Sequence, residues 1–128
     1  MGYMRHHAIV ITSWQQDSAV AAHAKAVELE MIVTPIVHTH LNGYLTFTVC
    51  PDGSKESWDE SHNGDDQRDK LVKWMEEQIV AYKMYWDWVE VQYGDDNGAT
   101  LVTRSSETVR RALHLCEMHN LDLSEHPL

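Results

Sequence analysis

The alternation of apolar and polar residues predicts a strand and then a helix at the start of the chain. β-branched residues dominate residues 6–14 (HHAIVITSW), which we expect to form the first strand. A helix should follow to about Glu30, with Asp17 or Ser18 as its N-cap. The apolar stripe of this helix is predicted to consist of Val20, Ala24, Val27 and Met31.

The pair Asn42-Gly43 predicts a tight β-hairpin. It separates extended runs over residues 33–41 and 44–50, and it supplies the two positive-φ residues of a type I′ turn. A two-residue turn places Leu41 opposite Tyr44 and His38 opposite Phe47. One face of this hairpin should then carry Ile36, His38, His40, Leu45, Phe47 and Val49.

The second half of the chain predicts a long loop, a helix, another hairpin and a last helix. The polar, acidic stretch up to Asp66, with Trp58 in its middle, is typical of a loop. The helix over residues 65–82 should bury Leu71, Trp74, Met75, Ile79 and Tyr82. Residues 86–93 and 99–104 then form two strands around a turn at 94–98, a helix runs to about His119, and residues 121–128 form a tail.

This order of elements predicts the fold class. It indicates a single α+β domain over residues 1–128, in which an antiparallel sheet carries helices on one face. Its core has the split βαβ (ferredoxin-like) arrangement, and a C-terminal hairpin and helix follow. The other face of the sheet must be wet, buried by a partner or used for binding, so we expect a homodimer or another homo-oligomer.

Charge and composition limit the classes of function. The formal net charge of −10 argues against direct binding of DNA or RNA phosphates, and it suits a basic protein partner or mimicry of nucleic acid. No apolar run approaches the ~20 residues of a membrane span, and no secretory signal pattern begins the chain, so a cytoplasmic protein is expected. Cys50 and Cys116 lack CxxC spacing, which predicts neither a zinc knuckle nor a disulfide framework.

His38 and His40 are the candidate metal ligands. On a strand they project to one side with Cα atoms about 7 Å apart, which lets two imidazoles share zinc or another divalent metal. The third ligand would be His6, His7 or His62. The alternative is an ordinary half-buried strand face and no cofactor.

Aromatic and acidic residues supply the candidate partner contacts. Trp86 and Trp88 alternate with Val89 and Val91, so one pair should face the helices and the other should face away. Outward tryptophans could stack on a base or fill a partner's pocket, whereas ordinary packing or a dimer interface is the alternative. The full set of candidate contacts is Trp58, Asp59, Asp65, Trp86, Trp88 and Tyr93.

Recognisable catalytic motifs do not occur in the sequence. It contains no glycine-rich phosphate loop, no GxSxG elbow and no HExxH pair. No catalytic residue is therefore predicted, and the enzyme question stays open with a preference for a non-enzyme.

Four stretches, HHAIVITSW, NGY, PDGSKESW and DWVEVQYGDD, resemble sequences of small proteins that tailed bacteriophages encode. The resemblance covers roughly residues 5–104 and supplies no active-site residues. It implies a viral accessory protein in the host cytoplasm. Such proteins act stoichiometrically, by occluding a host factor, masking a defence nuclease or sequestering a nucleotide signal.

The first hypothesis is therefore a phage-encoded, non-enzymatic protein that inhibits or sequesters a host component, including a defence-system component. Its partner would be a host protein or a small nucleotide, contacted through Trp86, Trp88 and the loop at 52–66. One alternative is a metal-dependent hydrolase that uses His38 and His40 with a loop carboxylate as base. Another is a structural or assembly protein of the virion, which predicts obligate oligomers.

Overall fold

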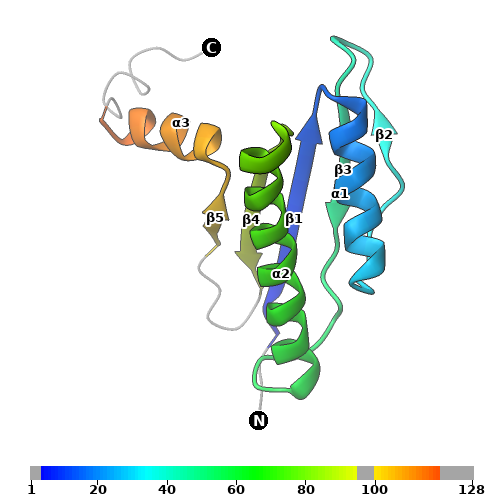
Figure 1. Ribbon diagram of the computed structural model, residues 1–128. Helices are drawn as coiled ribbons and strands as arrows, with labels where there is room; N and C mark the ends of the chain where they lie inside the picture. Colours follow the sequence, from blue (N-terminus) through cyan, green and yellow to red (C-terminus); the bar gives the residue numbers. More distant parts are fainter. Residues whose placement is uncertain (1–3, 95–99, 119–128) are drawn as a thin grey trace.

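Strands and helices follow one another in the predicted order (Figure 1). The structure is a computed structural model that describes residues 4–94 and 100–118. The N-terminal elements are β1 (His6–Ser13), α1 (Gln16–Glu28), β2 (Val37–His38) and β3 (Leu45–Val49). The remaining elements are α2 (Asp59–Tyr82), β4 (Asp87–Tyr93), β5 (Leu101–Ser105) and α3 (Glu107–Met118).

The strands form one antiparallel sheet in the order β2-β3-β1-β4-β5. The first four strands and the two helices between them have the split βαβ topology, and β5 extends the sheet beside β4. α1 and α2 lie side by side on one face of the sheet (Figure 1). The predicted α+β class, with helices on one face and a C-terminal hairpin and helix, is confirmed.

The core lies between the sheet and these two helices. Trp86 is its largest fully buried side chain, and its indole N–H donates to the Ser18 carbonyl of α1 at 2.7 Å. Trp88 lies opposite Ile11 in the sheet register and therefore points to the same side. The buried cluster consists of Ile9, Ile11, Ala22, Ala26, Phe47, Val49, Leu71, Val72, Met75, Trp86 and Trp88.

The apolar stripe predicted for α1 is wrong at Val20, Ala24 and Val27, whereas Met31, just beyond the end of the helix, packs against the core. Val20 and Val27 are about half exposed, whereas the buried face of the helix consists of small residues. Those residues are Ser18, Ala19, Ala22 and Ala26. Small side chains allow α1 to lie close to the sheet, where Phe47 and Ile11 fill the space between the layers.

The predicted hairpin forms, but its register differs by two residues. His38 lies opposite Leu45 rather than Phe47, and the Thr39 N–H donates to the Tyr44 carbonyl at 2.9 Å. Residues 40–43 therefore form a four-residue loop, which Thr39 closes by also donating its hydroxyl to the same carbonyl. A two-residue shift keeps His38 on the predicted face with Leu45, Phe47 and Val49, but it moves His40 from the strand into the loop.

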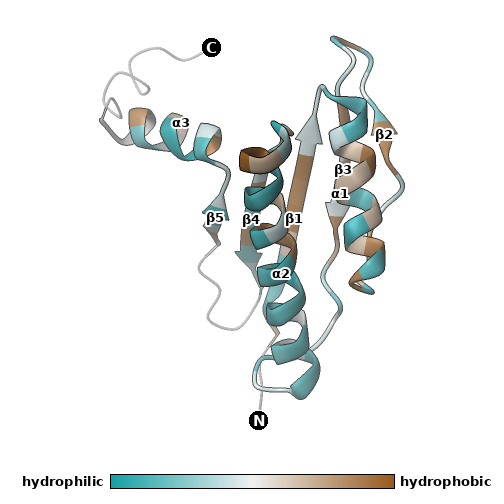
Figure 2. Cartoon of the chain, viewed as in Figure 1, coloured by the Kyte–Doolittle hydropathy of each residue, from teal (hydrophilic) through white to brown (hydrophobic). Residues whose placement is uncertain are grey.

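α2 begins at Asp59, inside the stretch predicted as a loop. Asp59 and Glu60 complement the positive end of the helix dipole, and Asp65 and Asp66 pair with Arg68 and Lys70 along the helix. These acidic residues therefore support a helix rather than a loop. Figure 2 shows that hydrophilic residues dominate this first half of α2.

The other boundaries agree with the sequence to within a few residues. The predicted turn at 94–98 falls mostly, and the tail at 121–128 entirely, outside the described residues. In the described part of the chain, no helix has the length and hydrophobicity to cross a membrane.

Candidate functional site

Trp58 is a large aromatic residue that stands on the surface at the start of α2. It is 45% exposed and directly precedes Asp59. Ser57 has a φ of +76°, a left-handed conformation that is unfavourable for a residue with a side chain and that sets the direction in which Trp58 leaves the backbone. A hollow of about 200 Å³ beside the ring is lined by Asp52, Gly53, Ser54, Trp58 and Glu60. We call Asp52, Trp58, Asp59 and Glu60 the Trp58 surface.

Negative charge is concentrated around this tryptophan. Residues 52–66 contain six carboxylates and one lysine, a formal charge of −5, which is half of the net charge of −10. The lysine, Lys55, places its Nζ atom 5.9 Å from the centre of the Trp58 ring. This cation lies close enough to interact with the ring face. Of the six carboxylates, Glu56, Asp65 and Asp66 pair with His7, Arg68 and Lys70, whereas Asp52, Asp59 and Glu60 are exposed around the ring.

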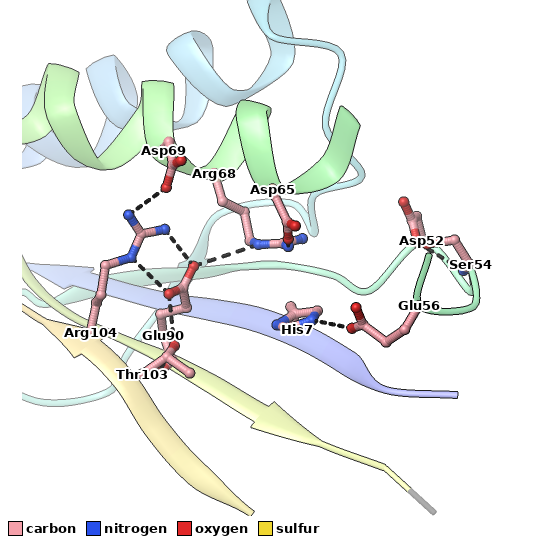
Figure 3. Close-up of polar contacts among 10 residues, drawn as sticks. All are labelled: His7, Asp52, Ser54, Glu56, Asp65, Arg68, Asp69, Glu90, Thr103 and Arg104. Atoms are coloured by element: carbon pink, nitrogen blue, oxygen red, sulfur yellow. Dashed lines mark hydrogen bonds and ion pairs between the residues drawn. The ribbon is translucent and has the colours of Figure 1, made fainter. Parts of the chain in front are cut away.

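The backbone before Trp58 is held in place by side chains (Figure 3). The Ser54 N–H and hydroxyl both donate to Asp52 Oδ1, at 2.9 and 2.6 Å. His7 Nε2 of β1 lies 2.9 Å from Glu56 Oε1, and Met4 forms a bridge with Lys55. The segment that carries Trp58 is therefore attached to the first strand.

Asp52 is ionised over a wide pH range. Its partial burial alone would raise the pKa of the carboxyl, but the two hydrogen bonds from Ser54 and the charge of Arg68 hold it below its usual value. A Cβ atom on Gly64 would lie 3.2 Å from Arg68 Nη1 and 3.4 Å from Asp52 Oδ2. Because glycine has no side chain, Arg68 and Asp52 can both lie against α2 at Gly64.

A buried carboxylate of the sheet lies beside α2. Glu90 of β4 is 4% exposed and receives two parallel hydrogen bonds of 2.8 Å from Arg104 Nε and Nη2 on β5. The Thr103 hydroxyl donates to the same carboxylate at 2.7 Å. Arg68 Nε of α2 lies 3.5 Å from the second oxygen (Figure 3).

These contacts join three elements through Glu90. Arg68 also pairs with Asp65 one turn earlier in α2, and Arg104 Nη1 pairs with Asp69 at 2.6 Å. The cluster of Asp65, Arg68, Asp69, Glu90 and Arg104 therefore fixes the first half of α2 against β4 and β5. We call these five residues the Glu90 cluster.

The Glu90 cluster holds α2 against the sheet and does not supply a reactive group. Burial alone would raise the pKa of Glu90, but the hydrogen bonds from Arg104 and Thr103 and the charges of Arg104 and Arg68 outweigh burial and lower it. Among the described residues, every buried side-chain nitrogen and oxygen has a hydrogen-bond partner. The carboxylate is therefore ionised and fully engaged, which suits an anchor rather than a general base.

Similarity to known proteins adds no residue to this site. No known protein family, curated protein or solved structure matches the chain. The fold class is supported by the strand order alone, and the candidate site by its own geometry.

Trp86 and Trp88 do not form the outward pair considered from the sequence. They are 1% and 2% exposed, and they face the helices, while Val89 and Val91 face away. The alternation was predicted, but the choice of face was open, because the sequence does not say which pair the helices cover. In this fold neither tryptophan offers a surface to a partner.

The other candidate contacts lie in three places. Trp58 and Asp59 belong to the Trp58 surface, and Asp65 lies further along α2 within the Glu90 cluster. Tyr93 is 39% exposed at the end of β4, with its ring centre 5.2 Å from that of His6. Tyr93 pairs with His6 in the sheet and belongs to the face opposite α1 and α2, not to the Trp58 surface.

The histidines do not gather into a metal-binding group within the described residues. His38 is an exposed residue of β2, and His40 lies in the loop instead of on the strand. His7 contacts Glu56, and His62 is exposed on α2. Across residues 4–94 and 100–118, no three His, Cys, Asp or Glu side chains are arranged to hold a metal ion. A metal site at His38 and His40 stays a prediction.

The Glu90 cluster was missed from the sequence. The sequence contained a signal for it. Glu90 lies two residues after Trp88 on the same strand, so it faces the core if the tryptophan does. A carboxylate at a core position needs a cation, and Arg104 on the neighbouring strand is its partner in the register.

Proposed function

We propose that this protein is a non-enzymatic binding protein with which a tailed bacteriophage inhibits or sequesters a component of its bacterial host. The contact is the Trp58 surface, and the partner is a host protein with a basic patch. The proposal combines the resemblance to phage proteins with the geometry around Trp58. The observation that carries it is a half-exposed tryptophan fixed in the most acidic segment of the chain.

The Trp58 surface has the composition of an interaction hot spot. Tryptophan is enriched at such positions because its ring buries much apolar area at little cost in conformational entropy. The surrounding carboxylates attract a basic partner and speed its association. Attachment of the segment to β1 through Glu56, and of α2 to the sheet through Glu90, limits the entropy lost on binding.

The same charge argues against a nucleotide as the ligand of this surface. Phosphate groups would approach six carboxylates and a single lysine within residues 52–66. Sites for phosphates usually present arginine, lysine or helix N-terminal amides without competing carboxylates. A basic protein is therefore the partner that this surface favours.

Affinity capture from a bacterial lysate tests the proposal. The full chain is immobilised as wild type, as Trp58→Ala and as Trp14→Ala, and the retained proteins are quantified by mass spectrometry. Trp14 is a matched control, since it is also half exposed but lies between β1 and α1, outside the Trp58 surface. We expect a retained protein with a basic surface that Trp58→Ala loses and Trp14→Ala keeps.

Two results would oppose the proposal. One is a retained set that is identical for wild type and Trp58→Ala. The other is a loss of equal size for both tryptophan variants, which would indicate non-specific adhesion of exposed aromatic rings. Circular dichroism of each variant shows that the comparison is made between folded proteins.

A further inference from the structure

The sheet face opposite α1 and α2 has no described helix over it. Antiparallel partners point to the same side, so the register assigns its residues. These residues are His6, Ala8, Val10, Thr12, Val37, Thr46, Thr48, Asp87, Val89, Val91, Tyr93, Val102 and Ser105. We call this set the open face.

The open face carries a continuous apolar row. Val10 in the central strand pairs with Val89, Ala8 pairs with Val91, and Val91 pairs in turn with Val102. Val10 is 37% exposed, although it stands in the middle of the sheet with strands on both sides. Threonines from β1 and β3 extend this surface towards β2 without adding charge.

The open face is almost uncharged in a strongly acidic protein. The chain contains 20 aspartates and glutamates and 10 lysines and arginines. The open face has one carboxylate, Asp87, which accepts a hydrogen bond from the Tyr85 hydroxyl at 3.0 Å, and none of the lysines or arginines. The other charged strand residues, Glu90 and Arg104, point to the helix side.

We propose that a second copy of this chain packs on the open face, which makes the protein a two-fold symmetric homodimer. A second copy carries the same charge of −10, so its approach is opposed wherever the surface is acidic. The open face is where that repulsion is smallest. A two-fold interface also needs a patch that complements itself, and an uncharged surface of valines, threonines and alanine can meet this condition.

The size of the open face fits a weak dimer. Strands lie ~4.8 Å apart and rise ~3.3 Å per residue, and the five strands contain 8, 2, 5, 7 and 5 residues, so the face covers roughly 430 Å² per copy. Two copies would bury roughly 850 Å² in total, which is the size of a weak, transient interface. Sheets that pack face to face in this way lie about 10 Å apart. This inference concerns a different surface from Trp58 and does not depend on the proposed function.

Sedimentation velocity of the full chain in the micromolar range tests the dimer. Val10→Glu places a carboxylate at the centre of the open face, and the two-fold axis brings two such carboxylates together. We expect wild type to sediment as a dimer, and Val10→Glu to raise the dissociation constant about 100-fold. Tyr93→Glu, at the rim of the same face, should act in the same direction with a smaller effect.

Val80→Glu is the matched control, because Val80 is 86% exposed on α2, away from the open face. It adds the same charge and should leave the dimer intact. A wild-type chain that is monomeric throughout the micromolar range overturns the proposal. A dimer that survives both Val10→Glu and Tyr93→Glu overturns it equally, since association would then use another surface.

Discussion

Glu90 of β4 links two neighbouring elements, since it accepts hydrogen bonds from Arg104 and Thr103 of β5 and pairs with Arg68 of α2. It is buried, yet its carboxylate is ionised, because Arg104, Thr103 and Arg68 supply hydrogen bonds and positive charge. A buried ion pair stabilises little relative to an apolar packing of the same volume, but removal of one partner is costly. The contribution of Glu90 is therefore one of position, since it fixes where α2 and β5 lie.

Replacement of Glu90 by glutamine should destabilise the protein. Glu90→Gln leaves Arg68 and Arg104 partly buried without their shared counter-charge, and we expect the free energy of unfolding to fall by about 3 kcal/mol. Urea denaturation followed by tryptophan fluorescence measures this change. Asp69→Asn is the control, since Asp69 contacts the same Arg104 from an exposed position and should cost no more than about 1 kcal/mol. Equal losses for the two variants would contradict the anchoring role.

The lowered pKa of Glu90 gives a pH dependence with a definite sign. As pH falls through the ordinary glutamate pKa of 4.5, the unfolded chain takes up the proton before the folded one does, so the free energy of unfolding decreases. This contribution is complete at neutral pH and is absent from Glu90→Gln. The difference in stability between wild type and Glu90→Gln should therefore be constant above the ordinary pKa and shrink in more acidic buffer. A difference that does not change with acidity would refute the ionised state of Glu90.

The positions of individual residues could be predicted from the sequence only in part. It predicted that Trp86 and Trp88 share a face that Val89 and Val91 do not, because strand alternation is a local property. It could not decide which face is buried, because that depends on helices far away in the sequence. The Glu90 cluster depends in the same way on a pairing between β4, β5 and α2 that no local pattern records.

At the scale of elements, α1 shows how packing distance selects side chains. The valines of this helix were predicted to face the sheet, but the small residues Ala19, Ala22 and Ala26 do so instead. Apolar spacing alone did not distinguish the two faces, since both carry apolar residues at helical intervals. The close approach of α1 to the large side chains of the sheet decides between them.

Enlargement of the buried face of α1 tests this packing. Ala22→Leu adds three carbon atoms at a position with no exposed surface, and overpacking should lower the free energy of unfolding by about 2 kcal/mol. Ala24→Leu makes the identical change on the exposed side of the same helix and should alter stability by less than about 0.5 kcal/mol. Thermal unfolding followed by circular dichroism compares them. A larger loss for Ala24→Leu would restore the stripe predicted from the sequence.

The boundaries of helices and strands could be predicted where residues with a strong turn preference mark them. The start of a helix whose first turns are polar could not. Asn42 and Gly43 adopt the positive φ angles expected for a hairpin, yet Thr39 closes a longer loop and shifts the register. The start of α2 was missed because its first turns are acidic and contain Gly64. Ion pairs and the helix dipole stabilise those turns, and a loop prediction based on polarity does not account for them.

At the scale of the whole molecule, charge distinguishes two regions of the surface. The Trp58 surface lies in a segment with half of the net charge, whereas the open face has a single carboxylate. Salt should weaken attraction of a basic partner to the first region and, by screening like charges, favour association of two copies through the second. The order of elements, the fold class and the acidity were readable from the sequence, but this division needed the sheet register and the position of α2.

The dissociation constant between the captured host protein and the variants of this chain tests the central claim most directly. Isothermal titration calorimetry with Trp58→Ala should give a dissociation constant about 30-fold higher than that of wild type, which corresponds to a hot-spot loss of about 2 kcal/mol. Trp14→Ala should leave the constant unchanged, and added salt should weaken wild-type binding. An unchanged dissociation constant for folded Trp58→Ala would contradict the assignment of the Trp58 surface as the binding site.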